Sequence, residues 1–139
     1  MRLAAAFAAL VGALCLLTLG AGSADACDAS KHLRYDEPVE LEGLLKSGTG
    51  HHDAQGDFEY VFLALDAPLC VDAPAGAGGD DFGNTGTEKP VDHIQVAGDL
   101  IGKGLPVGRR VTIKGKLFGA HTMWHAEEVL IDAGSIEPK

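Results

Sequence analysis

The chain has 139 residues, of which 46% are hydrophobic and 6% aromatic, and its formal net charge at pH 7 is −9. A chain of this length is expected to form a single domain with one modest hydrophobic core. The acidic balance argues against a nucleic acid partner, because such a chain and a phosphate backbone repel each other.

Residues 1–26 are predicted to be a secretory signal peptide rather than part of the fold. Arg2 provides a positive start, an uncharged Ala/Leu-rich run follows, and the sequence SADA at 23–26 offers a small-residue cleavage site. The run is also long enough to span a bilayer, so a retained membrane anchor is the alternative. Asp25 disagrees with a lipoprotein signal at Cys27. We therefore expect a periplasmic or secreted protein with no membrane span after signal removal.

The first half of the remaining chain, 27–139, predicts two strands. Short apolar runs alternate with Gly, Pro and Asp, and no long helical periodicity is present, which favours an all-β domain. Residues 38–47 form the first expected strand, in which Gly43 indicates a bend or bulge. A polar connection is expected at 48–57, followed by a central strand at 58–66 that ends at Pro68 and Cys70.

The second half predicts a long loop and three more strands. Residues 72–90 contain five glycines and two prolines, so we expect a long, flexible surface loop there. This loop lacks the spacing and final glutamate of an EF-hand, so calcium is not expected. Further strands are predicted at 91–97, at 109–118, where Gly115 lies in mid-strand, and at 126–132.

Five short strands with a glycine inside the first and the fourth predict a small, partly open barrel. The oligonucleotide/oligosaccharide-binding (OB) fold is the natural candidate. A six-stranded barrel or a small sandwich would give almost the same pattern. In an OB-type barrel the third and fifth strands lie side by side and parallel.

Cys27 and Cys70 are the two cysteines that remain after signal removal. An even count in an exported protein predicts a disulfide between them, with two free thiols as the alternative. Cys27 precedes the first expected strand and Cys70 follows the second. If those strands are antiparallel neighbours, both cysteines lie at one end of the barrel, within reach of the ~4.4–6.8 Å between Cα atoms that a disulfide permits.

Three stretches carry a family resemblance: PVELEGLL, LALDAPLCV and GRRVTIKGKLFGAHTMWH. They resemble the domain of unknown function 4431 family of exported bacterial proteins over residues 35–132, apart from 72–90. Family members often carry a further histidine after the one that corresponds to His125, where this chain has Ala126. The resemblance implies an OB-like β domain and a location in the cell envelope, and it implies no activity.

No catalytic motif is present in the sequence. It lacks a G-x-S-x-G, an H-E-x-x-H, a C-x-x-C and a phosphate-binding glycine loop. Cys70 would be a nucleophile only if reduced, which an exported setting argues against. Glu127 and Glu128 would point to opposite faces of a strand, so they are not expected to share a proton. We therefore predict that the chain is not an enzyme.

The histidines suggest two possible sites. The loop at 118–126 joins the last two strands and would line the binding face of an OB fold, so its candidate ligand-binding residues are His121, Thr122, Trp124 and His125. A zinc or copper site would instead use His93, His121 and His125 at one end of the barrel. His51 and His52, next to Asp53, are expected in a solvated turn.

Two functions follow from these observations. The first is an exported binding or interaction module for a protein or small ligand of the envelope, with no cofactor. The alternative is a transition-metal-binding protein of the envelope that uses the three histidines.

Overall fold

The computed structural model describes residues 27–76 and 85–139. The predicted signal peptide and residues 77–84 of the predicted loop lie outside the described residues. The described parts of the chain form six strands: β1 (His32–Arg34), β2 (Pro38–His52), β3 (Gly56–Asp72), β4 (Val91–Ala97), β5 (Arg110–Gly119) and β6 (Val129–Pro138). Within these parts, no helix has the length and apolar character needed to cross a membrane.

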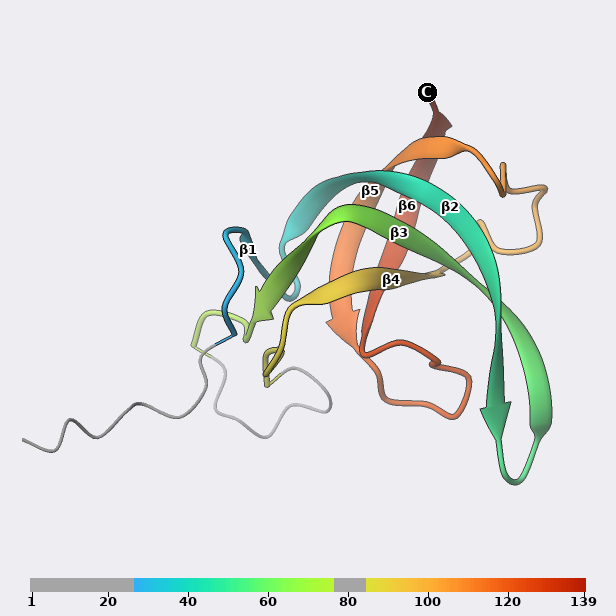
Figure 1. Ribbon diagram of the computed structural model, residues 1–139, viewed down its shortest axis with the longest axis horizontal. Coiled ribbons are helices and arrows are strands. Elements are labelled where there is room, and N and C mark those ends of the chain that lie inside the picture. Colours follow the sequence, from blue (N-terminus) through green and yellow to red (C-terminus); the bar gives the residue numbers. More distant parts are fainter. Residues whose placement is uncertain (1–26, 77–84) are drawn as a thin grey trace, which may run out of the picture.

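Strands β2 to β6 close into a five-stranded barrel (Figure 1). β2 lies between β3 and β5, β6 follows β5, and β4 pairs with both β6 and β3. β4 and β6 run parallel, with Gln95 opposite Leu130, and the other barrel pairs are antiparallel. The predicted all-β, five-stranded barrel is therefore confirmed, including the parallel third and fifth strands of the OB type.

The barrel interior is filled by apolar side chains from all five barrel strands, and in β4 and β6 consecutive residues are buried because both faces of these strands are covered. The largest fully buried aliphatic side chains are Leu41, Leu45, Leu63, Leu69, Ile94, Ile113, Leu117, Leu130 and Ile131. Each such side chain contributes about 1.5–3 kcal/mol on burial, so this interior is the main source of stability.

The expected polar connection at 48–57 was wrong, because β2 and β3 continue through it. Their ladder runs from Gly43 opposite Leu65 to His52 opposite Gly56, which leaves only residues 53–55 for the turn. The paired strands project beyond the rest of the barrel as a ribbon (Figure 1). Polar residues are tolerated there because the ribbon does not have to bury a full face.

The expected end of the second strand at Pro68 was also wrong, since β3 continues to Asp72. The pairing of β3 with β4 is irregular between Ala64 and Leu69, so Pro68 lies where the ladder does not require its missing N–H. Beyond this point β3 gains an additional short partner that the sequence did not predict: β1 pairs in parallel, with His32 opposite Cys70.

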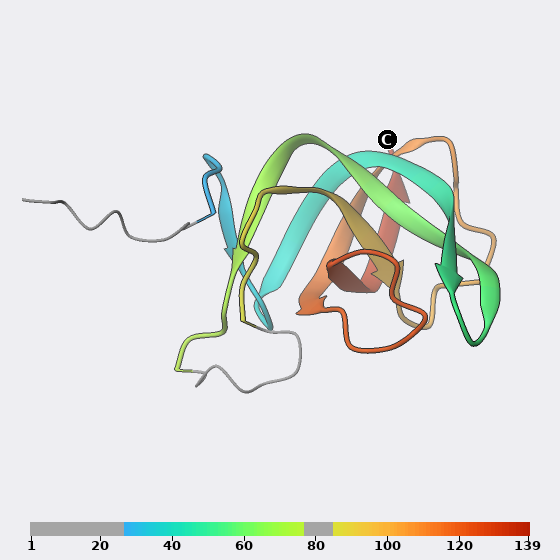
Figure 2. The same ribbon diagram turned by 60° about the horizontal axis from the view of Figure 1, so that its bottom comes forward.

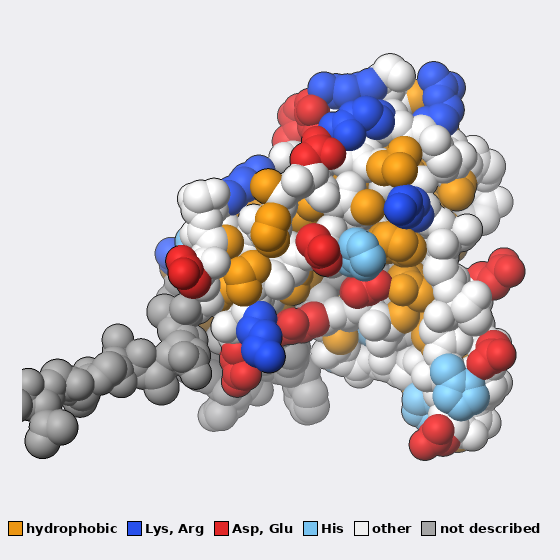
Figure 3. All heavy atoms as spheres, in the orientation of Figure 1, with side chains coloured by type: hydrophobic (Ala, Val, Ile, Leu, Met, Phe, Trp, Pro, Cys, Tyr) orange, Lys and Arg blue, Asp and Glu red, His pale blue; other side chains and the backbone are white. Residues whose placement is uncertain are grey.

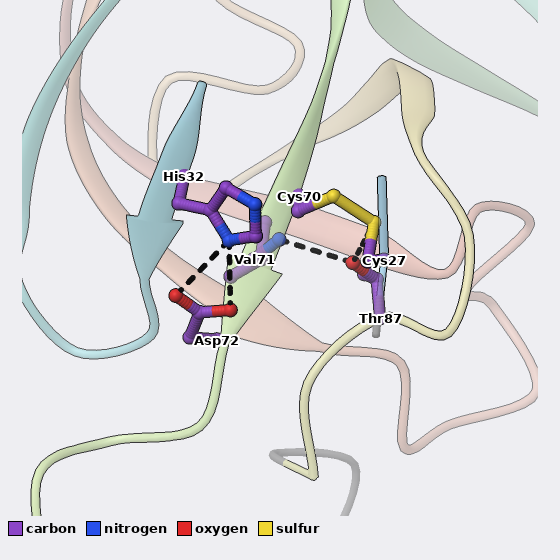
Figure 4. Close-up of a disulfide and its surroundings, with 6 residues drawn as sticks. All are labelled: Cys27, His32, Cys70, Val71, Asp72 and Thr87. Carbon is purple, nitrogen blue, oxygen red and sulfur yellow. Dashed lines mark hydrogen bonds and ion pairs between the residues drawn. A yellow bond between two sulfur atoms is a disulfide. The ribbon is translucent and has the colours of Figure 1, made fainter. Parts of the chain in front are cut away.

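The disulfide between Cys27 and Cys70 is present, with 5.9 Å between the Cα atoms (Figure 4). Cys70 lies inside β3 and is fully buried, rather than beyond the end of the strand as predicted. Thr87 is buried beside the bond: its hydroxyl donates to Cys27 Sγ at 3.6 Å and accepts the Val71 N–H at 3.0 Å. The predicted loop at 72–90 is thus fixed to the barrel at Thr87.

At both mid-strand glycines a Cβ would collide with a carbonyl oxygen of the facing strand, that of Ala64 for Gly43 and that of Asp132 for Gly115, and only Gly115 also lies at a bulge. The register of β5 against β6 shifts between Lys114 and Gly115, which is the bulge expected of a barrel corner. Gly43 has a regular register, but a Cβ there would collide with the carbonyl oxygen of Ala64 on β3. Gly43 therefore permits a close approach of two strands rather than a bulge.

The last strand begins later and ends later than predicted. β6 spans Val129–Pro138 instead of 126–132. The loop between β5 and β6 therefore occupies residues 120–128, and it crosses the end of the barrel that faces the viewer in Figure 2.

Candidate functional site

A pocket of about 480 Å³ opens where β3 separates from β4. The regular ladder between these strands ends with Phe62 opposite Gln95, and beyond it β3 continues only with β2. The pocket is lined by Ser47, Phe58, Glu59, Tyr60, Val61, Gln95, Val96, Ala97, Gly98, Ile101, Trp124, His125 and Leu130. Its size suits a small ligand, and its place between the β2–β3 hairpin and the β5–β6 loop is that of the binding face in OB folds.

Three aromatic side chains line this pocket, and the backbone positions two of them. Phe58 and Tyr60 stand opposite Gly50 and Gly48 on β2, and a Cβ at either glycine would collide with the facing ring. The rings therefore lie across the ribbon where β2 has no side chains. Trp124 meets Phe58 edge to face, with 5.4 Å between ring centroids and an interplanar angle of 82°, a favourable aromatic arrangement.

Gln95 attaches the loop 120–128 to the barrel. Its side chain is buried, at 6% exposure, and its Nε2 donates to the Trp124 carbonyl at 2.9 Å. Its Oε1 accepts the backbone N–H groups of Ala126, at 2.7 Å, and Glu127, at 3.2 Å. One amide thus satisfies three backbone groups of the loop and positions Trp124, which remains 50% exposed.

His125 shapes the same loop from within. Its Nδ1 accepts the backbone N–H groups of His121, at 2.9 Å, and Thr122, at 3.3 Å. The ring is therefore neutral with its proton on Nε2. Burial, and then the nearby His121, lower the pKa of His125. The His121 Nδ1 lies 3.0 Å from the Gly119 carbonyl, which can only accept, so this nitrogen carries the proton.

Glu127 lies at the edge of the three aromatic side chains of the pocket, Phe58, Tyr60 and Trp124, which together form its aromatic surface. The sequence alone predicts Glu127 only as a strand residue. Tyr60 donates its hydroxyl to Glu127 Oε1 at 2.7 Å. Burial, and then Glu127, raise the pKa of Tyr60 to about 12. His93 Nδ1 lies 3.7 Å from the same oxygen, and the His93 ring contacts the Phe62 ring at a tilt of 43°, with centroids 4.5 Å apart. The sequence placed Glu127 on a strand, whereas it precedes β6.

The structure brings together the predicted ligand-binding residues, and of the three predicted metal ligands it brings together His121 and His125, whose ring centroids are 4.8 Å apart. His121, Thr122, Trp124 and His125 share one loop, and Trp124 and His125 line the pocket. In residues 27–76 and 85–139, no group of three or more His, Cys, Asp or Glu side chains is placed to hold a metal ion. His93 contacts Glu127 and Phe62 instead, and the Nδ1 lone pair of His125 is occupied by backbone N–H groups.

The other histidine pair closes the β2–β3 hairpin. His51 Nδ1 lies 2.7 Å from Asp57 Oδ1, and its Nε2 is 3.7 Å from Asp53 Oδ1. His52 Nδ1 accepts the backbone N–H of Ala54 at 3.2 Å. Figure 3 shows histidine and acidic side chains together at this tip of the molecule. Both histidines are thus the last residues of β2, beside the turn at 53–55 rather than in it as predicted.

Comparison with known proteins gives one match. A family model described as a domain of unknown function, DUF4431, matches residues 93–137, which include β4, β5, β6 and the loop 120–128. No curated protein and no solved structure matches the chain. The predicted family resemblance is therefore confirmed over residues 93–137.

Proposed function

We propose, from the geometry of the barrel, that the chain is an exported binding module; the family model that residues 93–137 match is described without an activity. The binding site of this module is the pocket between β3, β4 and the loop 120–128. The ligand is a small molecule with an apolar body.

The observation that carries this proposal is the aromatic lining of the pocket. Phe58, Tyr60 and Trp124 line a pocket of about 480 Å³, and the lining is mainly apolar with a few polar side chains. Pockets of a few hundred Å³ with this composition are typical of small-ligand sites. Trp124 and Ile101 are 50% and 45% exposed at the border of the pocket, and covering these side chains with a ligand would be favourable.

Two further observations support the proposal. The net charge of −9 disfavours the nucleic acid ligands that many OB folds bind, so a different ligand is expected on the same face. The disulfide between Cys27 and Cys70 is consistent with an oxidising compartment, as an exported protein requires.

The single tryptophan of the chain provides a local test, because Trp124 lines the pocket. The neutral dye 1-N-phenylnaphthylamine absorbs where tryptophan emits, and its own emission rises in apolar surroundings. We expect the dye to bind with one site per chain and to receive energy from Trp124. Dye emission without energy transfer from Trp124 would place the binding elsewhere and refute the proposed site.

Ile101→Asp and Val107→Asp form a matched pair for this experiment. Both side chains are β-branched, and they are exposed at 45% and 44%. Ile101 lines the pocket, whereas Val107 does not. Dye binding should weaken at least about tenfold in Ile101→Asp, because an unpaired charge would lie against the bound apolar surface, and should remain unchanged in Val107→Asp. Equal effects of the two substitutions would contradict the assignment.

A further inference from the structure

The electrostatics of the pocket identify the class of ligand more closely. Glu59 is among the lining residues, and the lining, all of which lies in the described part of the chain, contains no lysine or arginine. Glu127 lies at the edge of the same aromatic surface, bonded to the Tyr60 hydroxyl. A cation that enters the pocket therefore meets one carboxylate residue in the lining, Glu59, and no lysine or arginine.

Three basic side chains form ion pairs away from the pocket. Lys114 pairs with Glu40 at 3.7 Å, and Arg110 and Lys139 pair with Asp66 and Glu42. These pairs join β5 and the residue that follows β6 to β2 and β3, outside the lining of the pocket. Lys46 stands opposite Phe62 on the ribbon and does not line the pocket either.

The aromatic lining adds a second attraction for positive charge. The face of an aromatic ring carries a negative partial charge, and organic cations bind within about 6 Å of ring centroids with roughly 0.5–2 kcal/mol per favourable contact. Phe58 and Trp124 stand almost perpendicular, at 82°, so they form two walls of a corner. The hydroxyl of Tyr60 donates to a carboxylate, which makes its ring more electron-rich.

We propose, on the basis of the proposed binding function, that the ligand of this pocket is a small organic cation, an alkylated ammonium group attached to an apolar body. The aromatic side chains cover the alkyl groups, and Glu59, whose side chain points to the opposite face of β3 from Phe58 and Tyr60, supplies the negative charge of the lining. The pocket volume of about 480 Å³ suits such a molecule. The net charge of −9 attracts it from solution.

The test compares choline with 3,3-dimethylbutan-1-ol, which has the same shape without the charge. Each is titrated against the unmodified chain and detected by displacement of the neutral dye, read as loss of energy transfer from Trp124. We expect choline to displace the dye at about one tenth of the concentration that the alcohol requires. Added salt should weaken choline and leave the alcohol unchanged.

Substitutions separate the contribution of the Glu59 charge from that of the aromatic rings. Glu59→Gln should reduce the preference for choline about two- to fivefold, while Glu137→Gln, at an exposed position of β6 outside the pocket, changes the net charge equally and should leave the preference intact. Phe58→Leu keeps an apolar wall without the ring and should weaken choline more than the alcohol.

Equal displacement by choline and the alcohol would overturn the cation assignment while leaving the binding site itself established by the dye. Failure of the dye to bind would instead remove the proposed function. The two failures are therefore distinguishable in the same assay.

Discussion

Replacing Gln95 with leucine should release the loop 120–128 from the barrel. The buried amide makes three hydrogen bonds to the loop backbone, at 2.7, 2.9 and 3.2 Å. Leucine has a similar size and fills the same space, but it leaves one carbonyl and two N–H groups without a partner. At about 0.5–1.5 kcal/mol net for each bond, Gln95→Leu should lower the free energy of unfolding by about 2–4 kcal/mol.

Two measurements check this prediction. Urea denaturation followed by far-UV circular dichroism gives the loss of stability. Quenching of Trp124 by acrylamide under native conditions reports the loop, because Gln95 binds the Trp124 carbonyl. We expect stronger quenching in the variant. Gln55→Leu, at an exposed position of the hairpin turn, is the control for the same change of side chain. A loss below about 1 kcal/mol with unchanged quenching would refute the role assigned to Gln95.

Three further predictions concern the disulfide, the loop histidine and the ribbon. Joint replacement of Cys27 and Cys70 by serine removes a bond that closes 43 residues, and should cost about 4 kcal/mol by the chain-entropy relation, with m-value and unfolding midpoint measured in urea. Burial lowers the pKa of His125 below 6.5, so the stability that its neutral ring contributes is complete above about pH 6.5 and is lost as the pH falls towards the folded-state pKa. His125→Asn keeps an acceptor and does not titrate. In thermal melts, the melting temperature of this variant should therefore fall less between neutral and acidic pH than that of the unmodified chain. Gly50→Ala should displace the Phe58 ring and weaken dye binding with little loss of stability, and a large loss without any change in binding would contradict this role.

The architecture was predictable from the sequence because it depends on alternation along each strand. The five barrel strands were found where apolar residues alternate, for example in β5, where Val111, Ile113 and Leu117 are fully buried. Strand β1 was missed because three residues carry no periodicity. The ends of β2 and β3 were missed because GTGHHDAQGD looks like a loop, although a ribbon that leaves the barrel needs no apolar face.

Only part of the pocket lining could be predicted from the sequence, because the pocket combines segments that are distant in the sequence. The loop containing Trp124 could be selected by its position between the last two strands. The contributions of Phe58 and Gln95 could not, since they depend on cross-strand neighbours and on the loop folding back. Gln95 lies between buried Ile94 and Val96, where alternation alone predicts an exposed polar side chain. The side chain of Gln95 is buried because the loop 120–128 covers it and its amide binds the loop backbone.

The histidine nitrogens on which the metal prediction depends have a second use in this loop. Imidazole is a metal ligand through an unprotonated nitrogen, and the same lone pair accepts backbone N–H groups in a tight loop. In His125 the second use prevails, because two N–H groups of the loop converge on Nδ1. The spacing of His121 and His125 therefore reflects hydrogen bonds within the loop 120–128.

Two separate parts of the fold hold the aromatic side chains of the pocket in place. Phe58 and Tyr60 depend on the ladder of β2 and β3 and on the glycines opposite them, whereas Trp124 depends on Gln95 and the loop. Loss of the loop anchor should therefore remove one wall and leave the other two in place. If the aromatic surface is the source of affinity, Gln95→Leu will weaken ligand binding without abolishing it. Abolition in that variant would mean that the loop, rather than the ribbon, carries the recognition.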